Sequence, residues 1–311
     1  MEFGLIMMFD DSGNDTASVY RHSRLTASHA RSAGFSTLWL TEHHGNPTRL
    51  CPSIPLMMGY LAHHTPMTLG AATILLSHYS SRHIAEEIGM LTHMYPNRFA
   101  FGFAKGGGSE VMLHDNGDEN HARRTMIDRL GEVHTFLHGS AKQPLYPSVQ
   151  TPPPLYIASK EPESIRYAAR NGIGIMAGHK WTLEETAEAA ALYQEEHPLH
   201  HAPDLMLSRF FLLGETHKSA LSSVTDAIAK RREKMEPLRE SRHNNQWREG
   251  VLEEESPIGE LQDIEKLFRR YRDMGVTRLA LRPATADSEA TFNSIQHIRP
   301  LIRSYSRQVK I

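Results

Sequence analysis

Two hydrophobic patterns alternate along the chain. Short, almost continuous apolar runs such as 2–9 and 205–213 are typical of buried strands. Between them lie longer stretches in which apolar residues recur every three or four positions, which predicts amphipathic helices. Capping signals support the boundaries: Asp15 or Thr16 opens the first helical stretch and Gly34 closes it.

The two patterns together predict eight strands, each followed by a helix. The predicted strands are 2–9, 35–41, 67–75, 98–104, 154–159, 173–177, 205–213 and 277–281. The predicted helices are 16–33, 52–64, 81–95, 121–138, 162–171, 183–196, 261–274 and 291–306.

This order of elements indicates an α/β fold of the (β/α)8 TIM barrel type. A doubly wound sheet usually has a glycine-rich dinucleotide turn after its first strand, whereas the sequence there reads FDDSG (9–13). We therefore expect one barrel domain over residues 1–311. Surplus residues form insertions after strands four (105–120) and seven (215–259), on the face where barrel active sites form. A third surplus stretch, 140–153, precedes strand five and lies on the opposite face.

Composition narrows the classes of partner. Lys plus Arg is 34 and Asp plus Glu is 36, a net charge of −2, which argues against nucleic acid or an anionic membrane surface as a partner. The one cysteine, Cys51, excludes an internal disulfide framework and fits a reducing compartment. The amino-terminal segment lacks the features of a signal peptide, and no apolar run approaches the roughly 20 residues that span a bilayer. We expect a cytoplasmic protein.

Histidine is abundant, with 20 residues, several of them in adjacent pairs. Neighbouring histidines in a strand point to opposite faces, and the sequence contains neither CxxC nor HExxH. His134 and His138, four apart on a predicted helix, have the spacing closest to that of metal ligands. We expect no dedicated metal site.

Two strand ends carry candidate chemistry. Strand two ends in Glu42 and His43, a carboxylate and an imidazole that can transfer protons near neutral pH. Strand four ends in Lys105 and Gly106, followed by two more glycines, so that an ammonium and backbone N–H groups can approach an anion. Read alone, either segment could equally be an ordinary polar loop.

Strand five leads into a third candidate. Pro162 suits the first turn of a helix, so Glu161 is predicted as its cap. The N–H groups of that turn and the Ser164 hydroxyl could bind a phosphate, but the carboxylates of Glu161 and Glu163 could satisfy the same helix end. Together the three strand ends favour a phosphorylated cofactor with a proton-transfer group over it.

The order of these segments resembles the luciferase-like flavin monooxygenases, which include bacterial luciferase and two-component alkane and alkanesulfonate oxygenases. The resemblance covers about residues 1–180 and resumes at 256–283. It rests on four segments: GFSTLWLTEHH (34–44), TLGAATILLSHYSSRHIAEEIGMLTHMYPNRFAFGFAKG (68–106), PPPLYIASKEPESIRYAARNGIGIMAG (152–178) and SPIGELQDIEKLFRRYRDMGVTRLALRP (256–283).

The resemblance implies an FMN-type flavin, used as reduced FMN, lying across the barrel mouth. It places His43 at the family's catalytic histidine, with Glu42 as the acid before it. Ala72 and Thr73 fall where the family often has a non-prolyl cis peptide bond beneath the flavin ring.

The same resemblance assigns a phosphate-binding corner. Lys105 falls where luciferase has an arginine on the flavin phosphate, next to Gly106. Ser164 matches the family's phosphate-binding hydroxyl, whereas Lys160 and Glu161 replace an acid and a serine.

The implied activity is that of an alkanal monooxygenase-type enzyme. A separate NAD(P)H:flavin reductase would supply the reduced flavin, which reacts with O₂ to a C4a-peroxyflavin and transfers one oxygen atom to a small organic substrate. Residues 215–259 would close over the site as a lid, or equally form a solvated helix and turn.

Family members commonly pair through the helices at 52–64 and 81–95, so we expect a homodimer. The residues taken as surplus apolar surface there are Met57, Met58, Leu61, Ile84, Ile88 and Leu91.

Three other functions compete with this one. A deazaflavin (F420)-dependent oxidoreductase could use the same barrel, and a non-catalytic flavin-binding partner subunit would not need the histidine. An aldolase or isomerase acting on a phosphorylated substrate is disfavoured by the apolar end of strand six (175–178).

Overall fold

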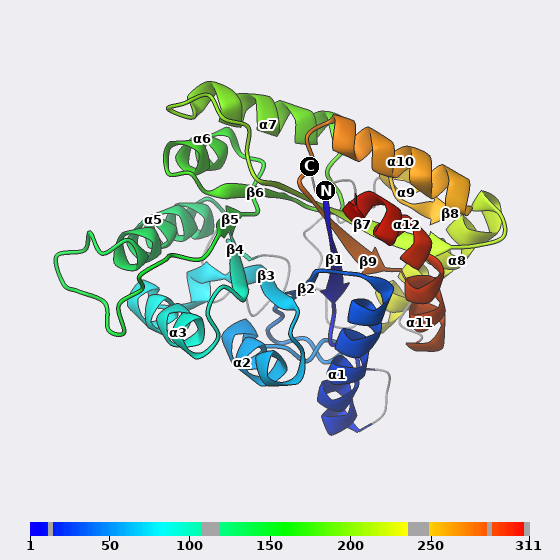
Figure 1. Ribbon diagram of the computed structural model, residues 1–311, viewed down its shortest axis with the longest axis horizontal. Helices are drawn as coiled ribbons and strands as arrows, with labels where there is room; N and C mark the ends of the chain where they lie inside the picture. The colour runs from blue at the N-terminus through cyan, green and yellow to red at the C-terminus, as the bar shows by residue number, and fades with distance from the viewer. Residues whose placement is uncertain (12–14, 107–118, 236–248, 285–287, 308–311) are drawn as a thin grey trace.

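Eight parallel strands close into a barrel ringed by helices (Figure 1). The computed structural model describes residues 1–11, 15–106, 119–235, 249–284 and 288–307. The barrel strands are β1 (Glu2–Met7), β2 (Thr37–Leu40), β3 (Thr68–Leu75), β4 (Phe99–Ala104), β5 (Leu155–Ile157), β6 (Gly174–Ala177), β7 (Leu205–Leu213) and β9 (Arg278–Pro283). They pair in this order, and β9 returns to β1, which confirms the predicted (β/α)8 TIM barrel.

The helices follow the strands around the outside of the barrel. They are α1 (Thr16–Ala33), α2 (Ile54–His64), α3 (Ser81–Met94), α5 (Glu119–Leu137), α6 (Pro162–Arg170), α7 (Leu183–Glu196), α8 (His217–Met235), α9 (Glu249–Glu253), α10 (Leu261–Asp273), α11 (Ser288–His297) and α12 (Arg299–Arg307), with a 3₁₀ turn at Leu76–His78. The predicted caps of α1 are both present: Asp15 accepts from the backbone N–H of Ala17, and Gly34 adopts a φ of 101°.

One predicted helix differs from the structure, and one short strand was not predicted. The stretch 291–306 was expected to be one helix, but α11 and α12 are separate helices on either side of Ile298. Pro300 is the second residue of α12, where its missing N–H costs no helical hydrogen bond. Prediction also missed the two-residue strand β8 (Ile258–Gly259), which pairs with the end of β7.

The insertion after strand seven begins as a packed helix. Ala220 and Val224 of α8 lie in a small apolar cluster with Phe210, Leu252 and Ile258. Residues 236–248 of the expected lid lie outside the described residues, as do 107–118 of the other insertion. The described part of 215–259 is therefore a packed helical segment beside β7.

Large side chains fill the barrel interior where neighbouring strands carry glycine. Trp39 and Tyr156 are fully buried, and their rings meet edge to face with centroids 5.9 Å apart. A Cβ added at Gly70 would lie 2.1 Å from the Trp39 ring, and one at Gly174 would lie 2.5 Å from the Tyr156 ring. Because the glycines leave room, the two rings plug the barrel beneath its mouth.

A polar network ties the lower ends of the strands together. Asp204 accepts hydrogen bonds from the Tyr156 hydroxyl and from Thr277 Oγ1, both at 2.5 Å. Arg278 Nε donates to the same carboxylate, 3.1 Å from Oδ2. This end of the barrel is therefore closed by satisfied polar groups, which leaves the opposite end for a ligand.

The apolar residues taken as a pairing surface on the helices at 52–64 and 81–95 are instead part of the protein's own core. Their exposed fractions are at most 8 %. The prediction was wrong about these residues because each helix buries two apolar stripes. One stripe packs on the barrel and the other packs on the neighbouring helix. Exposed apolar side chains do occur on the same helices, at Leu56 (73 %), Met90 (53 %) and Met94 (55 %).

None of the described helices combines the length and the apolar character needed to cross a membrane.

Candidate active site at the barrel mouth

A cavity of about 280 Å³ opens at the carboxyl ends of the strands. This is near the low end of small-molecule sites, which run from roughly 300 to 1,000 Å³. It is lined by Ile6, Met8, Thr41, Glu42, His43, Arg49, Ala72, Thr73, Leu75, Ala158, Met176, Ala177, Gly178, His179, Met206, Ser208 and Arg282. Four of the sequence-predicted site residues, Glu42, His43, Ala72 and Thr73, are thus brought together.

Glu42 is a buried carboxylate that links β2 to β3. Its Oε1 accepts from His44 Nε2 at 2.8 Å and from the backbone N–H of Leu75 at 3.3 Å. Its Oε2 is buried without a hydrogen-bond partner among the described residues. The pKa of the Cys51 thiol is raised to about 12, mainly because the thiol is buried and to a smaller extent because of the charge of Glu42.

His43 forms a chain with two residues from the neighbouring loops. Arg49 Nη1 lies 2.8 Å from His43 Nε2, and Arg49 Nε lies 3.5 Å from Asp10 Oδ1. Because a guanidinium can only donate, Nε2 is the acceptor and the ring proton sits on Nδ1. The chain therefore fixes the ring and its tautomer.

His44 occupies different surroundings from His43. Its ring binds Glu42 and stacks on His78 with centroids 4.9 Å apart, and it is not part of the cavity lining. The expectation that the two adjacent histidines point to different sides is confirmed. Glu42 is hydrogen-bonded to His44. The side chain that contacts the His43 ring is Arg49, which sequence reasoning missed.

Small residues form the wall of the cavity at the third to fifth strands. Ala72 and Thr73 on β3 face it together with Ala158, just beyond β5. The peptide bond between Ala72 and Thr73 is cis, as the resemblance predicted. The low side-chain volume leaves a surface suited to a flat ring system.

The expected phosphate-binding corner lies at the ends of β4 and β5. These strands are paired through Phe103 and Ile157, so Lys105 and the start of α6 follow neighbouring strands at the same end. The backbone carbonyl of Lys105 accepts from Ser77 Oγ at 2.7 Å, and Gly106 has a φ of 75°. The other two glycines of this segment lie outside the described residues.

At the start of α6, the predicted residues separate into two groups. Lys160 is paired with Glu185 at 2.9 Å and Glu161 with Arg123 at 3.2 Å. Glu161 stands at the N-cap, but its side chain makes no capping hydrogen bond.

Ser164 is the third residue of α6. Its Oγ is fully buried without a hydrogen-bond partner among the described residues. Ser164 therefore remains a candidate for binding an anion at this helix end, whereas Lys160 is paired with Glu185 of α7.

The wall opposite the small residues carries polar side chains that sequence reasoning missed. Ser208 on β7 and Arg282 on β9 face the cavity, and His179 follows β6. The nitrogens of the His179 ring lie 3.2 and 3.3 Å from Arg282 Nη1. Burial and then the charge of Arg282 hold the pKa of His179 well below its usual range, so the ring is neutral.

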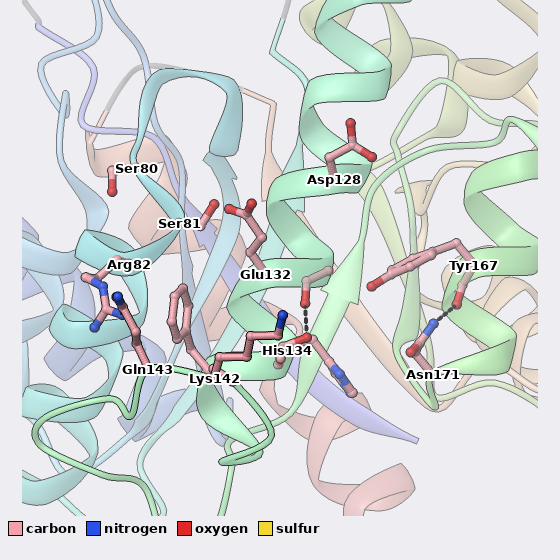
Figure 2. Close-up of a pocket in the computed structure, with 14 residues that line it drawn as sticks. Ser80, Ser81, Arg82, Asp128, Glu132, His134, Lys142, Gln143, Tyr167 and Asn171 are labelled. Atoms are coloured by element: carbon pink, nitrogen blue, oxygen red, sulfur yellow. Dashed lines mark hydrogen bonds between the residues drawn. The ribbon is translucent and has the colours of Figure 1, made fainter.

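A larger hollow of about 750 Å³ lies outside the barrel, along α5 (Figure 2). Its lining mixes the charges of Arg82 and Lys142 with those of Asp128 and Glu132. Arg82 Nη2 donates to Gln143 Oε1 at 3.2 Å across it. It is a polar seam between helices and a loop, far from the convergent groups of the mouth.

Among the described residues there is no group of three or more His, Cys, Asp or Glu side chains arranged to hold a metal ion. The rings of His134 and His138 stack on each other with centroids 4.0 Å apart, and His138 Nδ1 lies 2.8 Å from the His134 carbonyl oxygen.

Comparisons with known proteins agree on the family. N-acetyl-S-alkylcysteine monooxygenase of Bacillus subtilis (strain 168) is 26 % identical over 183 residues, covering 56 % of this chain and 55 % of that protein. The match thus spans about half the length of this relative.

Solved structures share the whole fold. Monooxygenase RslO1 from Streptomyces bottropensis superposes with a TM-score of 0.84 at 16 % identity, over 98 % of this chain and 100 % of the other. The oxygenating constituent of 3,6-diketocamphane monooxygenase from Pseudomonas putida, solved in complex with FMN, gives 0.75 at 16 % identity over 97 % of each chain. An F420-dependent secondary alcohol dehydrogenase gives 0.74 at 13 % identity over 97 % of this chain and 99 % of the other.

The sequence model of the luciferase-like monooxygenases matches residues 1–278, nearly the whole of the barrel just described. The chain belongs to the luciferase-like monooxygenase family.

Proposed function

We propose that the protein is a monooxygenase that uses reduced FMN, made by a separate NAD(P)H:flavin reductase, to place one oxygen atom from O₂ in a small organic substrate. The observation that carries this proposal is the position of His43, which faces the same cavity as the flat wall at Ala72, Thr73 and Ala158. A proton-transfer group and a surface for a planar ring thus share one small space.

The residues at the mouth fit a phosphorylated flavin. The wall of small side chains would take the ring, and Lys105, Gly106 and the first turn of α6 would take the phosphate. The buried Ser164 hydroxyl without a partner among the described residues supports this assignment, because such a group costs stability unless a ligand uses it. Bound reduced flavin would supply the electrons that activate O₂.

In this proposal, His43 is the residue that transfers a proton. Since Arg49 donates to Nε2, the Nδ1–H is the proton that the ring can offer to an oxygen developing negative charge in the cavity. Asp10 holds Arg49, so the ring is fixed before substrate arrives. Glu42 braces β2 against β3 at Leu75 and thereby positions His43 relative to the flat wall.

Methionine side chains serve a different purpose. Met8, Met176 and Met206 line the cavity and are at most 9 % exposed. Apolar, adaptable side chains keep water from the reacting groups and can pack against an organic substrate.

The test is a cofactor and turnover assay on the full chain. We expect the purified protein to bind reduced FMN more tightly than reduced F420. With a flavin reductase, NADH and O₂, a screen of aldehydes, thioethers and cyclic ketones should give a product heavier by one oxygen atom.

Each alternative has its own outcome. Binding of F420 with no binding of FMN would replace this proposal by an F420-dependent oxidoreductase. Binding of reduced FMN, with one molecule of hydrogen peroxide released for every O₂ consumed whatever the substrate, would indicate a non-catalytic flavin-binding subunit.

A further inference from the structure

The far wall of the cavity carries a positive charge, Arg282, that is not among the residues assigned above to the flavin. In the order of the barrel, β7 and β9 stand four strands away from β3 and β4, so they face the candidate flavin wall. The register pairs Phe210 with Arg282 and Ser208 with Ala280. Ala280 belongs to the interior cluster, so Arg282, two residues further along β9, also projects inward.

Arg282 is held in a defined position although it is buried. Its exposed fraction is 7 %, and the guanidinium carbon lies 4.6 Å above the centre of the Phe210 ring. The neutral His179 ring lies beside Nη1 and meets Phe210 edge to face, with centroids 5.2 Å apart. The pair therefore presents one positive charge to the cavity.

Ser208 adds a second polar group to this wall. It lines the cavity, is 7 % exposed, and its Oγ is buried without a hydrogen-bond partner among the described residues. A buried hydroxyl of this kind points to a ligand atom. Glu42, the one acidic side chain among the described residues that line the cavity, is on β2 and binds His44.

The wall is supported from behind. Arg209 on β7 points away from the cavity and donates to the backbone carbonyls of Trp181 at 2.8 Å and Glu255 at 2.9 Å, and more weakly to that of Gly178 at 3.4 Å. The Glu255 carboxylate accepts from the backbone N–H of Leu183 at 2.8 Å. These contacts fix the 178–183 segment that carries His179, as a preorganised binding wall requires.

We propose that the substrate of this monooxygenase is an organic carboxylate, whose anionic group is bound by Arg282 and Ser208. Its apolar body lies against Met176 and Met206, toward the flat wall. That this carboxylate is a substrate rests on the proposed function. That the cavity binds an anion here rests only on the geometry of β6, β7 and β9. A guanidinium in a poorly hydrated cavity binds a carboxylate in fork geometry more strongly than an exposed one does.

The test compares two probes of the same length and shape, hexanoate and hexanamide. Their affinities for the full chain at pH 7.5 are measured by calorimetry or ligand-observed NMR, with and without reduced FMN under nitrogen. We expect hexanoate to bind at least about tenfold more tightly than hexanamide, because only hexanoate carries the charge.

Variants locate the site. Arg282→Met should remove the preference for hexanoate, a loss of about 10- to 100-fold, and Arg282→Lys should keep part of it. Ser208→Ala should weaken hexanoate binding by about three- to tenfold. The surface variant Arg303→Met, on α12, should bind both probes as the parent does. If Arg282→Met does not fold, hexanoate binding by Ser208→Ala and Arg282→Lys still tests the proposal.

Equal binding of the two probes by the parent overturns the proposal. So does an Arg282→Met variant that loses affinity for reduced FMN while its preference for hexanoate is unchanged, since Arg282 would then serve the flavin. Retained hexanoate binding in a protein that binds no flavin would leave the anion site standing and overturn the proposed function alone.

Discussion

Two adjacent histidines at the mouth of the barrel make different contacts. His43 faces the cavity and is held by Arg49, whereas His44 satisfies the buried Glu42. We propose that His43 transfers a proton and that His44 has a structural role, although the two are neighbours in the chain. Paired variants can separate the two.

His43→Ala should fold and bind reduced FMN within a few fold of the parent. Oxygenation should fall by about 10²–10⁴, the range for a lost acid–base group, and the oxygen should appear as hydrogen peroxide. The measurement is product and peroxide formed for each NADH consumed.

His44→Ala is the matched control for that variant. It leaves the Glu42 carboxylate with one partner fewer, so it should lower the melting temperature and largely spare coupling. Full coupling in His43→Ala together with uncoupling in His44→Ala would show that the active-site register is wrong.

Lys105→Ala tests the phosphate-binding corner. Reduced FMN should bind about 10- to 150-fold more weakly, the loss expected for a charge-assisted contact, whereas riboflavin, which has no phosphate, should bind as before. Anaerobic titrations of both flavins make the comparison. Equal losses for the two would place the Lys105 ammonium away from the phosphate.

Cys51 should make stability depend on pH under alkaline conditions. Its folded pKa of about 12 means that the native thiol keeps its proton, whereas the unfolded thiol releases it above about pH 8.5. The free energy of unfolding should therefore fall as pH rises, by up to about 1.4 kcal/mol for each unit. Urea denaturation at pH 7.5 and 9.5 should show a shallower decline in Cys51→Ala; identical slopes would contradict the raised pKa.

Sequence reasoning found the site residues at predicted strand ends. It missed the residues whose place at the site depends on how other segments of the chain pack. Glu42 and His43 were found because a strand visibly ended there. Arg282 was missed because the strand was predicted to stop at 281, whereas β9 runs on to Pro283. Arg49 comes from a loop whose approach to Asp10 is a tertiary contact. The Lys160–Glu185 pair likewise joins the loop before α6 to the first turn of α7, which only the fold brings together.

Helices and strands were predicted correctly where local capping signals mark their ends, and were missed where packing alone determines them. Helix α1 matches its prediction because Asp15 and Gly34 are local caps. The break between α11 and α12 was missed because the apolar periodicity continues across it and Pro300 sits where a helix tolerates it. The two residues of β8 are too few to give a pattern.

The contact between β3 and Trp39 predicts a stability difference between two glycine variants. Gly70→Ala would place its Cβ 2.1 Å from the indole ring, so the fold should lose roughly 1–3 kcal/mol of stability through overpacking. Gly59→Ala, in α2, meets only Leu91 Cδ2 at 3.8 Å, and the helix should gain up to about 1 kcal/mol. Urea denaturation measures both; a stable Gly70→Ala protein would mean that the ring has room to move.

Eight repeats of strand and helix were enough to predict the closed barrel. They did not predict which apolar residues of α2 and α3 are exposed to solvent. The helices bury Met58 and Ile88 and expose Leu56 and Met90, because burial depends on how the two helices pack on each other as well as on the barrel.

The exposed apolar side chains of α2 and α3 lead us to propose a homodimer through these helices. Light scattering at micromolar concentration should give twice the chain mass. The double variant Leu56→Gln/Met90→Gln should shift the protein toward monomer, whereas Leu199→Gln, equally exposed on the loop after α7, should not. A parent protein that is monomeric at every concentration would exclude this pairing.

The position of Trp39 beneath the cavity should make its fluorescence sensitive to a flavin bound at the mouth. The indole is enclosed by apolar neighbours and belongs to the same interior cluster as Met8, Met176 and Met206, which line the cavity above it. The broad emission of an indole overlaps the near-ultraviolet absorption band of oxidised flavins. Entry of a flavin into the mouth should therefore quench this emission by energy transfer, so that arrival and departure of the flavin can be followed optically without a label.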